Sequence, residues 1–136
     1  MVRAMVGVWL FGGCRVDEIR RLELDCVTWD KGTDDTTGDP FTICLLHIPQ
    51  NKTSRPFNKP VDPVVGQLIG AWKLIRPPQP DLIDRKTGQK RPHLFCHRGQ
   101  LVGKDYLGSV FSCDQGVARV RSLSQIIEAR RWRPAR

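Results

Sequence analysis

The stretch GGCRVDEIRRLELDCV, residues 12–27, is the basis of the fold prediction. In it, two glycines and an arginine precede an amphipathic segment that begins with acidic residues. The apolar run at residues 4–11 lacks the alternation of a strand, and Gly12 and Gly13 follow it directly. Glycines in that position are typical of a helix end. The stretch therefore predicts a buried helix, then a tight turn that carries Arg15.

A second helix is expected to start directly after this turn. Asp17 can cap it, and Glu18 is favoured in its first turn by the helix dipole. The helix is expected to be short and to end near Asp25. Its buried side would comprise the apolar residues Ile19, Leu22 and Leu24.

The next segments predict two strands and a β-hairpin. Residues 26–29 and 41–48 are rich in β-branched and aromatic residues, whereas residues 30–40 form a polar Gly/Asp/Thr loop. The turn-rich residues 49–56 precede a predicted return strand at residues 57–61. The tip of that hairpin would carry Lys52, Thr53 and Arg55.

A clear amphipathic helix follows, and the elements after it are shorter. Asp62 is a suitable cap, Pro63 fits the first helical position, and the double proline at residues 77–78 ends the helix. The expected buried stripe and its flanks consist of Val64, Leu68 and Trp72 with Val65, Ile69 and Ile75. Beyond a linker-like stretch at residues 79–93, we expect a short strand or turn at residues 94–99 and a helical segment at residues 104–111.

Composition favours a globular protein with a polyanionic partner. The chain has 136 residues, 40% hydrophobic and 26% charged, with a net charge of +8 and a pI near 9.7. These values suit one domain or a piece of a larger protein, and the positive charge favours nucleic acid. The longest apolar run is too short for a bilayer and makes a poor signal peptide. We therefore expect a cytoplasmic protein with no membrane partner.

The five cysteines predict neither a disulfide framework nor a zinc site. They are odd in number and contain no Cys-x-x-Cys pair, so they are expected to be small core residues in a reducing compartment. His93, Cys96 and His97 lack a second cluster at ligand spacing. No metal site is expected.

These motifs, in this order, resemble the tyrosine recombinase (phage integrase) family. Residues 12–27 are similar to its Gly-x-Arg-x-x-Glu helix start, in which Arg15 matches the first catalytic arginine and Glu18 the acidic residue. Residues 51–77 resemble its lysine-bearing hairpin and following helix, and residues 94–111 resemble the next segment. The resemblance covers about residues 4–111. It implies an α+β fold with helices packed around a small antiparallel β-sheet, and DNA and other recombinase subunits as partners.

The resemblance also implies roles for particular residues. In this family a tyrosine attacks a DNA phosphodiester without a metal or cofactor. Arg15 would hold the non-bridging phosphate oxygens, and Lys52 would protonate the leaving 5′-oxygen. Arg55 would contact DNA beside Lys52. Glu18 would either orient the arginine-bearing turn or interact only with the helix dipole.

A second lysine competes with Lys52. The stretch RKTGQKRP, residues 85–92, is closer in letters to the family's hairpin consensus, which would favour Lys86. The order of the predicted elements favours Lys52, because this lysine directly follows a predicted strand and precedes the amphipathic helix. Lys86 lies beyond that helix, among prolines.

The chain also departs from the family pattern. It contains no His-x-x-Arg motif, and its only tyrosine, Tyr106, falls in a segment where a core or helix-start role is expected. We therefore expect residues 1–111 to be the front half of a catalytic domain, derived from a site-specific integrase of a mobile element and inactive alone. Residues 112–136 would be a frameshifted segment or a basic DNA-binding tail. The alternative function is a non-catalytic basic module that binds DNA or a recombinase partner.

Overall fold

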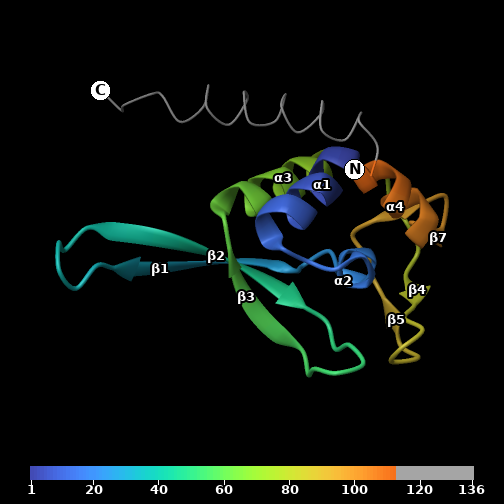
Figure 1. Ribbon diagram of the computed structural model, residues 1–136, viewed down its shortest axis with the longest axis horizontal. Helices are drawn as coiled ribbons and strands as arrows, with labels where there is room; N and C mark the ends of the chain where they lie inside the picture. Colours follow the sequence, from blue (N-terminus) through green and yellow to red (C-terminus); the bar gives the residue numbers. More distant parts are fainter. Residues whose placement is uncertain (113–136) are drawn as a thin grey trace.

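Helices cover one face of a three-stranded antiparallel sheet in the computed structural model, which describes residues 1–112 (Figure 1). Helices α1 and α3 lie side by side over the sheet, with α2 and α4 beside them. This arrangement confirms the predicted α+β class. The helices span Val2–Gly12 (α1), Val16–Arg21 (α2), Pro63–Ile75 (α3) and Lys104–Ser112 (α4). Residues 113–136, which include Cys113 and nearly all of the predicted tail, lie outside the described part.

The main sheet has the strand order β1-β2-β3. The strands span Val27–Thr33 (β1), Pro40–Ile48 (β2) and Phe57–Val61 (β3). Val27 pairs with Leu46 across β1 and β2, and Cys44 pairs with Val61 across β2 and β3. The predicted hairpin and return strand are thus present. The β1 and β2 strands run farther into the predicted loop than expected, forming a ribbon that extends beyond the helices (Figure 1).

Helix α1, which was expected to be buried, is buried only in part. Its N-terminal half is in the core, where Met5 and Val8 are fully buried. Its last turns leave Trp9, Leu10 and Phe11 37–40% exposed, although the helix packs against α3. The Trp9 ring stacks on Phe111 of α4 with 4.5 Å between ring centroids. The predicted helix end is confirmed, since Gly13 adopts a left-handed φ of 58°.

Helix α2 begins and ends differently from the prediction. Its N-cap is Arg15 rather than Asp17, which lies in the first turn. The helix ends at Arg21 instead of near Asp25, because Leu22 leaves the helical conformation and its carbonyl accepts a hydrogen bond from Leu94 N at 2.7 Å. Pairing with this distant segment replaces the helical hydrogen bonds that the local sequence would favour.

Helix α3 matches the sequence prediction in its cap and most of its buried face. Asp62 Oδ1 accepts a hydrogen bond from Val64 N at 2.9 Å, as an N-cap side chain should. Ile75 is 75% exposed, so its predicted place beside the buried stripe is wrong. The helix approaches the sheet closely at Gly66, where a Cβ atom would lie 2.5 Å from the Trp29 ring.

The predicted linker at residues 79–93 contains a small hairpin instead. Strands β4 (Leu82–Ile83) and β5 (Lys90–Arg91) pair, and β6 (Cys96–His97) pairs with β7 (Gln100–Leu101) just beyond. Between the two hairpins, Leu94 and Phe95 are fully buried in the core. Cysteines 14, 26, 44 and 96 are also buried and unpaired, which agrees with their predicted role as small core residues.

Candidate nucleic-acid interface

Arg15 occupies the turn between α1 and α2 with its side chain exposed to solvent. Gly13 redirects the chain, and the fully buried Ile19 anchors the helix that follows. Arg15 has extended backbone angles as the N-cap of α2, and its backbone N–H donates to Glu18 Oε2 at 2.9 Å. None of the ion pairs within residues 1–112 involves Arg15. Its guanidinium donors therefore remain available for an anion.

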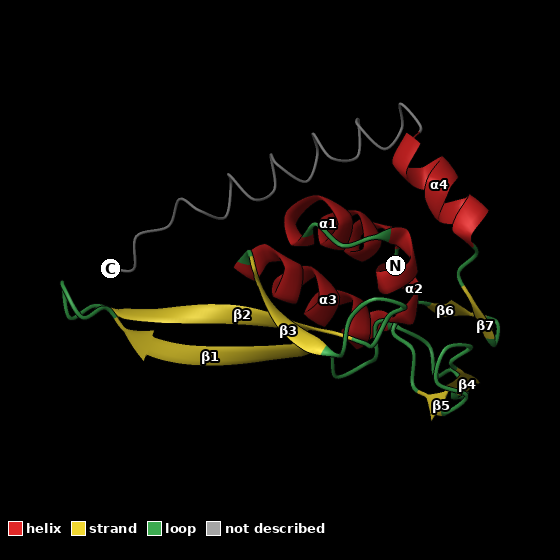
Figure 2. Cartoon of the chain, turned by 60° about the horizontal axis from the view of Figure 1, so that its bottom comes forward, coloured by secondary structure: helices red, strands yellow, loops and turns green. Residues whose placement is uncertain are grey.

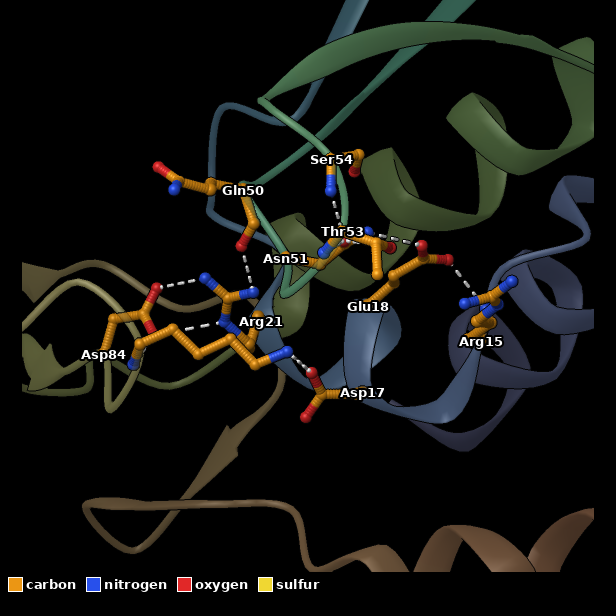
Figure 3. A network of polar contacts seen from close by, with 10 residues as sticks. Arg15, Asp17, Glu18, Arg21, Gln50, Asn51, Thr53, Ser54 and Asp84 are labelled. Carbon is orange, nitrogen blue, oxygen red and sulfur yellow. Dashed lines mark hydrogen bonds and ion pairs between the residues drawn. The ribbon is translucent and has the colours of Figure 1, made fainter.

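Glu18 links this turn to the loop that joins β2 and β3, residues 49–56 (Figure 3). While one carboxylate oxygen accepts from Arg15 N, the other accepts from Asn51 Nδ2 at 3.4 Å. The side-chain oxygen of Asn51 in turn accepts from the backbone N–H groups of Thr53 and Ser54, both at 2.9 Å. One carboxylate thus contacts both segments on which the sequence places basic candidate residues.

Lys52 and Arg55 lie exposed on this 49–56 loop, at the hairpin position predicted for them. Neither forms an ion pair within the described part of the chain. A pocket of about 380 Å³ separates the loop from the α1–α2 turn. It is lined by Arg15, Glu18, Asn51, Thr53, Phe57 and Lys59 among others, but not by Lys52 itself.

Lys59 of β3 is a basic residue at this pocket that the sequence analysis did not single out. Its Nζ donates to the carbonyl oxygen of Gly13 at 3.1 Å, so it lies against the same turn that carries Arg15. The pocket therefore holds two cationic side chains and one carboxylate, Glu18. The planar guanidinium of Arg15 and the ammonium group of Lys59, at the same pocket, are suited to bind phosphate oxygens.

Arg21 and Asp84 form a buried ion pair that the sequence analysis also missed. Arg21 Nε and Nη2 donate to the two carboxylate oxygens of Asp84 at 3.1 and 2.6 Å, and the side chains are 6% and 5% exposed. Arg21 Nη1 also donates to the carbonyl of Gln50 at 2.5 Å. This guanidinium ties together α2, the 49–56 loop and the β4–β5 hairpin (Figure 3). The partners lie 63 positions apart, so no local pattern could have paired them.

The pKa of Asp84 reflects this contact. Burial alone would raise the pKa of the carboxyl group, but the hydrogen bonds from Arg21 and from the backbone N–H of Lys86 hold it below its usual value. A carboxyl group whose pKa is lower in the folded state than in the unfolded state stabilises the fold. This stabilisation is complete at every pH above the pKa of the group in the unfolded state. That stabilisation is lost as the pH falls through the folded-state pKa.

The difference in unfolding free energy between the wild type and Asp84→Asn is therefore expected to depend on pH. It should be largest above about pH 4 and shrink at lower pH, where the wild-type carboxyl group also becomes neutral. Urea unfolding followed by circular dichroism at a series of pH values measures this difference. A difference that stays constant from neutral to acidic pH would contradict the assignment.

Lys86 lies in the turn of the β4–β5 hairpin, not in an unstructured linker. Its Nζ contacts Asp17 Oδ2 at 2.5 Å, and the two side chains are 36% and 33% exposed. Burial alone would raise the pKa of Asp17, but the hydrogen bond and positive charge of Lys86 lower it.

Both lysines that the sequence offered as candidates, Lys52 and Lys86, lie in turns between antiparallel strands. Only Lys52 follows a long strand and leads back to α3.

Tyr106 lies in the first turns of α4 and is 47% exposed, while the neighbouring Leu107 is fully buried. The expected helix position is confirmed, although the ring itself is not in the core. In the part of the chain that the structure describes, no three His, Cys, Asp or Glu residues gather as a metal site would require.

No helix among residues 1–112 has the length and apolar character needed to cross a membrane. Comparisons with protein-family models, with curated proteins and with solved structures gave no match.

Proposed function

We propose that this chain is the front part of a tyrosine recombinase catalytic domain, from a site-specific integrase of a mobile element, and that it binds DNA without cleaving it alone. The observation that carries the proposal is the Glu18 carboxylate, which contacts both the Arg15 turn and the loop that bears Lys52. Sequence order alone suggested that these two segments act together, and this contact supports it.

Arg15 would bind the non-bridging oxygens of a DNA phosphate. Its guanidinium is planar and permanently charged, so it can donate two parallel hydrogen bonds at any physiological pH. The Glu18 contact to its backbone fixes the turn without occupying the guanidinium. This geometry favours a supporting role for Glu18 over a purely dipolar one.

Lys52 would supply the proton for a leaving 5′-oxygen in a complete enzyme, and Arg55 would contact the adjacent backbone. Both side chains are exposed on a loop that is anchored at Gln50 and Asn51. An anchored turn with exposed basic side chains can present a lysine to a DNA phosphate. Lys59, at the same pocket as Arg15, would add a fourth positive charge to those of Arg15, Lys52 and Arg55. Other recombinase subunits would be the protein partners.

A second candidate function is a non-catalytic basic module that binds DNA or a recombinase partner. The absence of a His-x-x-Arg motif from the 136 residues favours it, because the phosphate clamp would then lack its later members. In this case Arg15 has only a structural role, and its removal would not alter DNA affinity.

Arg15→Ala and Lys52→Ala are expected to weaken binding to duplex DNA and to reduce its salt dependence. The affinity of the wild type should fall steeply with salt, and each lost phosphate contact should reduce the log–log slope by about 0.9. Fluorescence anisotropy titrations at several salt concentrations measure both quantities. Lys31→Ala is the matched control, because Lys31 is exposed on β1. Together with β2, this strand forms the ribbon that extends beyond the helices (Figure 1).

If Arg15→Ala and Lys52→Ala retain the affinity and salt slope of the Lys31→Ala control, the phosphate-binding role is wrong. Binding that is insensitive to salt, or absent at low salt, would argue against DNA as the partner of this chain.

A further inference from the structure

We infer that the β4–β5 hairpin, residues 82–91, is a second DNA-backbone contact, separate from the pocket that holds Arg15. The inference rests on the proposed function, since it assumes that DNA lies against the Arg15 pocket. It gives this hairpin a role that the resemblance does not assign, because the sequence offered residues 85–92 only as an alternative position for the catalytic lysine.

The hairpin has a defined turn despite its two-residue strands. Gly88 N donates to Asp84 O at 2.7 Å, and Asp84 N donates to Gln89 O at 2.8 Å. The Asp84 carboxylate also accepts from Lys86 N at 2.9 Å, and Gly88 takes the left-handed φ of 71° that closes the turn. The basic side chains of the hairpin therefore project from an ordered backbone.

The hairpin is held beside the loop that carries Lys52. The Arg21 guanidinium binds the Asp84 side chain and the Gln50 carbonyl at the same time. Figure 2 and Figure 1 both show the β4–β5 hairpin and the β2–β3 connection on the same side of the molecule. A groove of about 510 Å³ lies between them, lined by Gln50 and Pro56 on one side and by Lys86 and Arg91 on the other. The carboxylate-bearing Glu23 and Asp84 also line it. A ligand that spans the groove would touch both turns.

The charge of the hairpin favours a polyanion. Residues 84–91, DRKTGQKR, contain four cations and one carboxylate. That carboxylate, Asp84, is buried against Arg21, so it does not offset the surface charge of the hairpin. Lys86 is paired with Asp17, and Arg91 lies 3.8 Å from Glu23. Arg85 and Lys90 are exposed and form no ion pair within residues 1–112.

Duplex DNA is the occupant that fits this arrangement. Its backbone carries regularly spaced phosphates, so two basic turns on either side of a groove can bind along one duplex. Contacts of this kind fix the position of the protein on DNA and carry no sequence preference. The hairpin would therefore add affinity and salt dependence without adding specificity.

The test compares two double variants of the 136-residue chain that remove the same charge. Arg85→Gln with Lys90→Gln alters the hairpin, whereas Arg3→Gln with Lys31→Gln removes one arginine and one lysine from exposed positions on α1 and β1. Anisotropy titrations of a short labelled duplex at several salt concentrations give the slope of log affinity against log salt. Thermal melting followed by circular dichroism checks that both variants stay folded.

The hairpin variant is expected to lower the slope by about 1.8, since two phosphate contacts are lost at about 0.9 each. The control should keep the wild-type slope. If the two double variants behave alike while Arg15→Ala weakens binding, the hairpin contact is refuted and the proposed function stands. If Arg15→Ala, Lys52→Ala and the hairpin variant all match the control, both proposals are refuted.

Discussion

Replacing Asp84 with alanine is expected to lower the free energy of unfolding by about 3–5 kcal/mol. The substitution leaves the Arg21 guanidinium buried with no carboxylate to balance it, since the Arg21 side chain is only 6% exposed. Its remaining partner would be the carbonyl oxygen of Gln50, which accepts a single hydrogen bond from Nη1. Burying an unpaired charge costs far more than losing an exposed contact.

Urea unfolding at neutral pH measures this loss, and two further variants test its cause. Asp17→Ala breaks the exposed pair with Lys86 and should change the unfolding free energy by less than about 1 kcal/mol. Arg21→Met combined with Asp84→Leu removes both charges and should recover much of the stability lost in Asp84→Ala. A loss in Asp84→Ala no larger than that in Asp17→Ala would show that this pair does not hold the segments together.

The elements that local sequence determines were predicted well. The Asp62 cap and Pro63 set the start of α3, and Gly13 ends α1 in the left-handed conformation. These features depend on backbone preferences and capping within a few residues. The long strand β2 is likewise evident from its run of β-branched and apolar residues.

Elements determined by distant partners were not predicted. The end of α2 depends on a hydrogen bond between Leu22 and Leu94, 72 positions along the chain, rather than on the helix-forming residues that follow Arg21. The β4–β5 hairpin has strands of only two residues, too short for a periodic pattern. Its stability comes from the turn and from the Arg21–Asp84 pair, neither of which is evident from composition.

The same distinction between local and distant determinants applies to the residues of the candidate site. Arg15 and Glu18 could be selected from a local motif, since a Gly-x-Arg-x-x-Glu helix start spans only six consecutive residues. The contact between Glu18 and Asn51 depends on tertiary packing, as does the position of Lys59 against Gly13. The sequence could therefore nominate Arg15 and Glu18 as candidates, but not show which residues share a pocket with them.

The 136-residue chain is expected to form no covalent adduct with DNA. The proposed chemistry needs a hydroxyl in line with the phosphate, and groups that only stabilise the transition state cannot replace the attacking group. Tyr106 is the only tyrosine, and it lies in the first turns of α4, whose Leu107 is buried in the core. Arg15 and Lys52 would then bind a phosphate that nothing attacks.

Incubation with a nicked suicide substrate, followed by denaturing electrophoresis, tests this expectation. Tyr106→Phe is the matched variant, because it removes one hydroxyl and keeps the ring. The wild type and this variant should both give free protein and intact DNA, while Arg15→Ala should differ from them only in reversible binding. An adduct formed by the wild type and abolished in Tyr106→Phe would assign the nucleophile to α4. The proposed inactivity of the chain would then be wrong, because a phenol on that helix would have reached the phosphate.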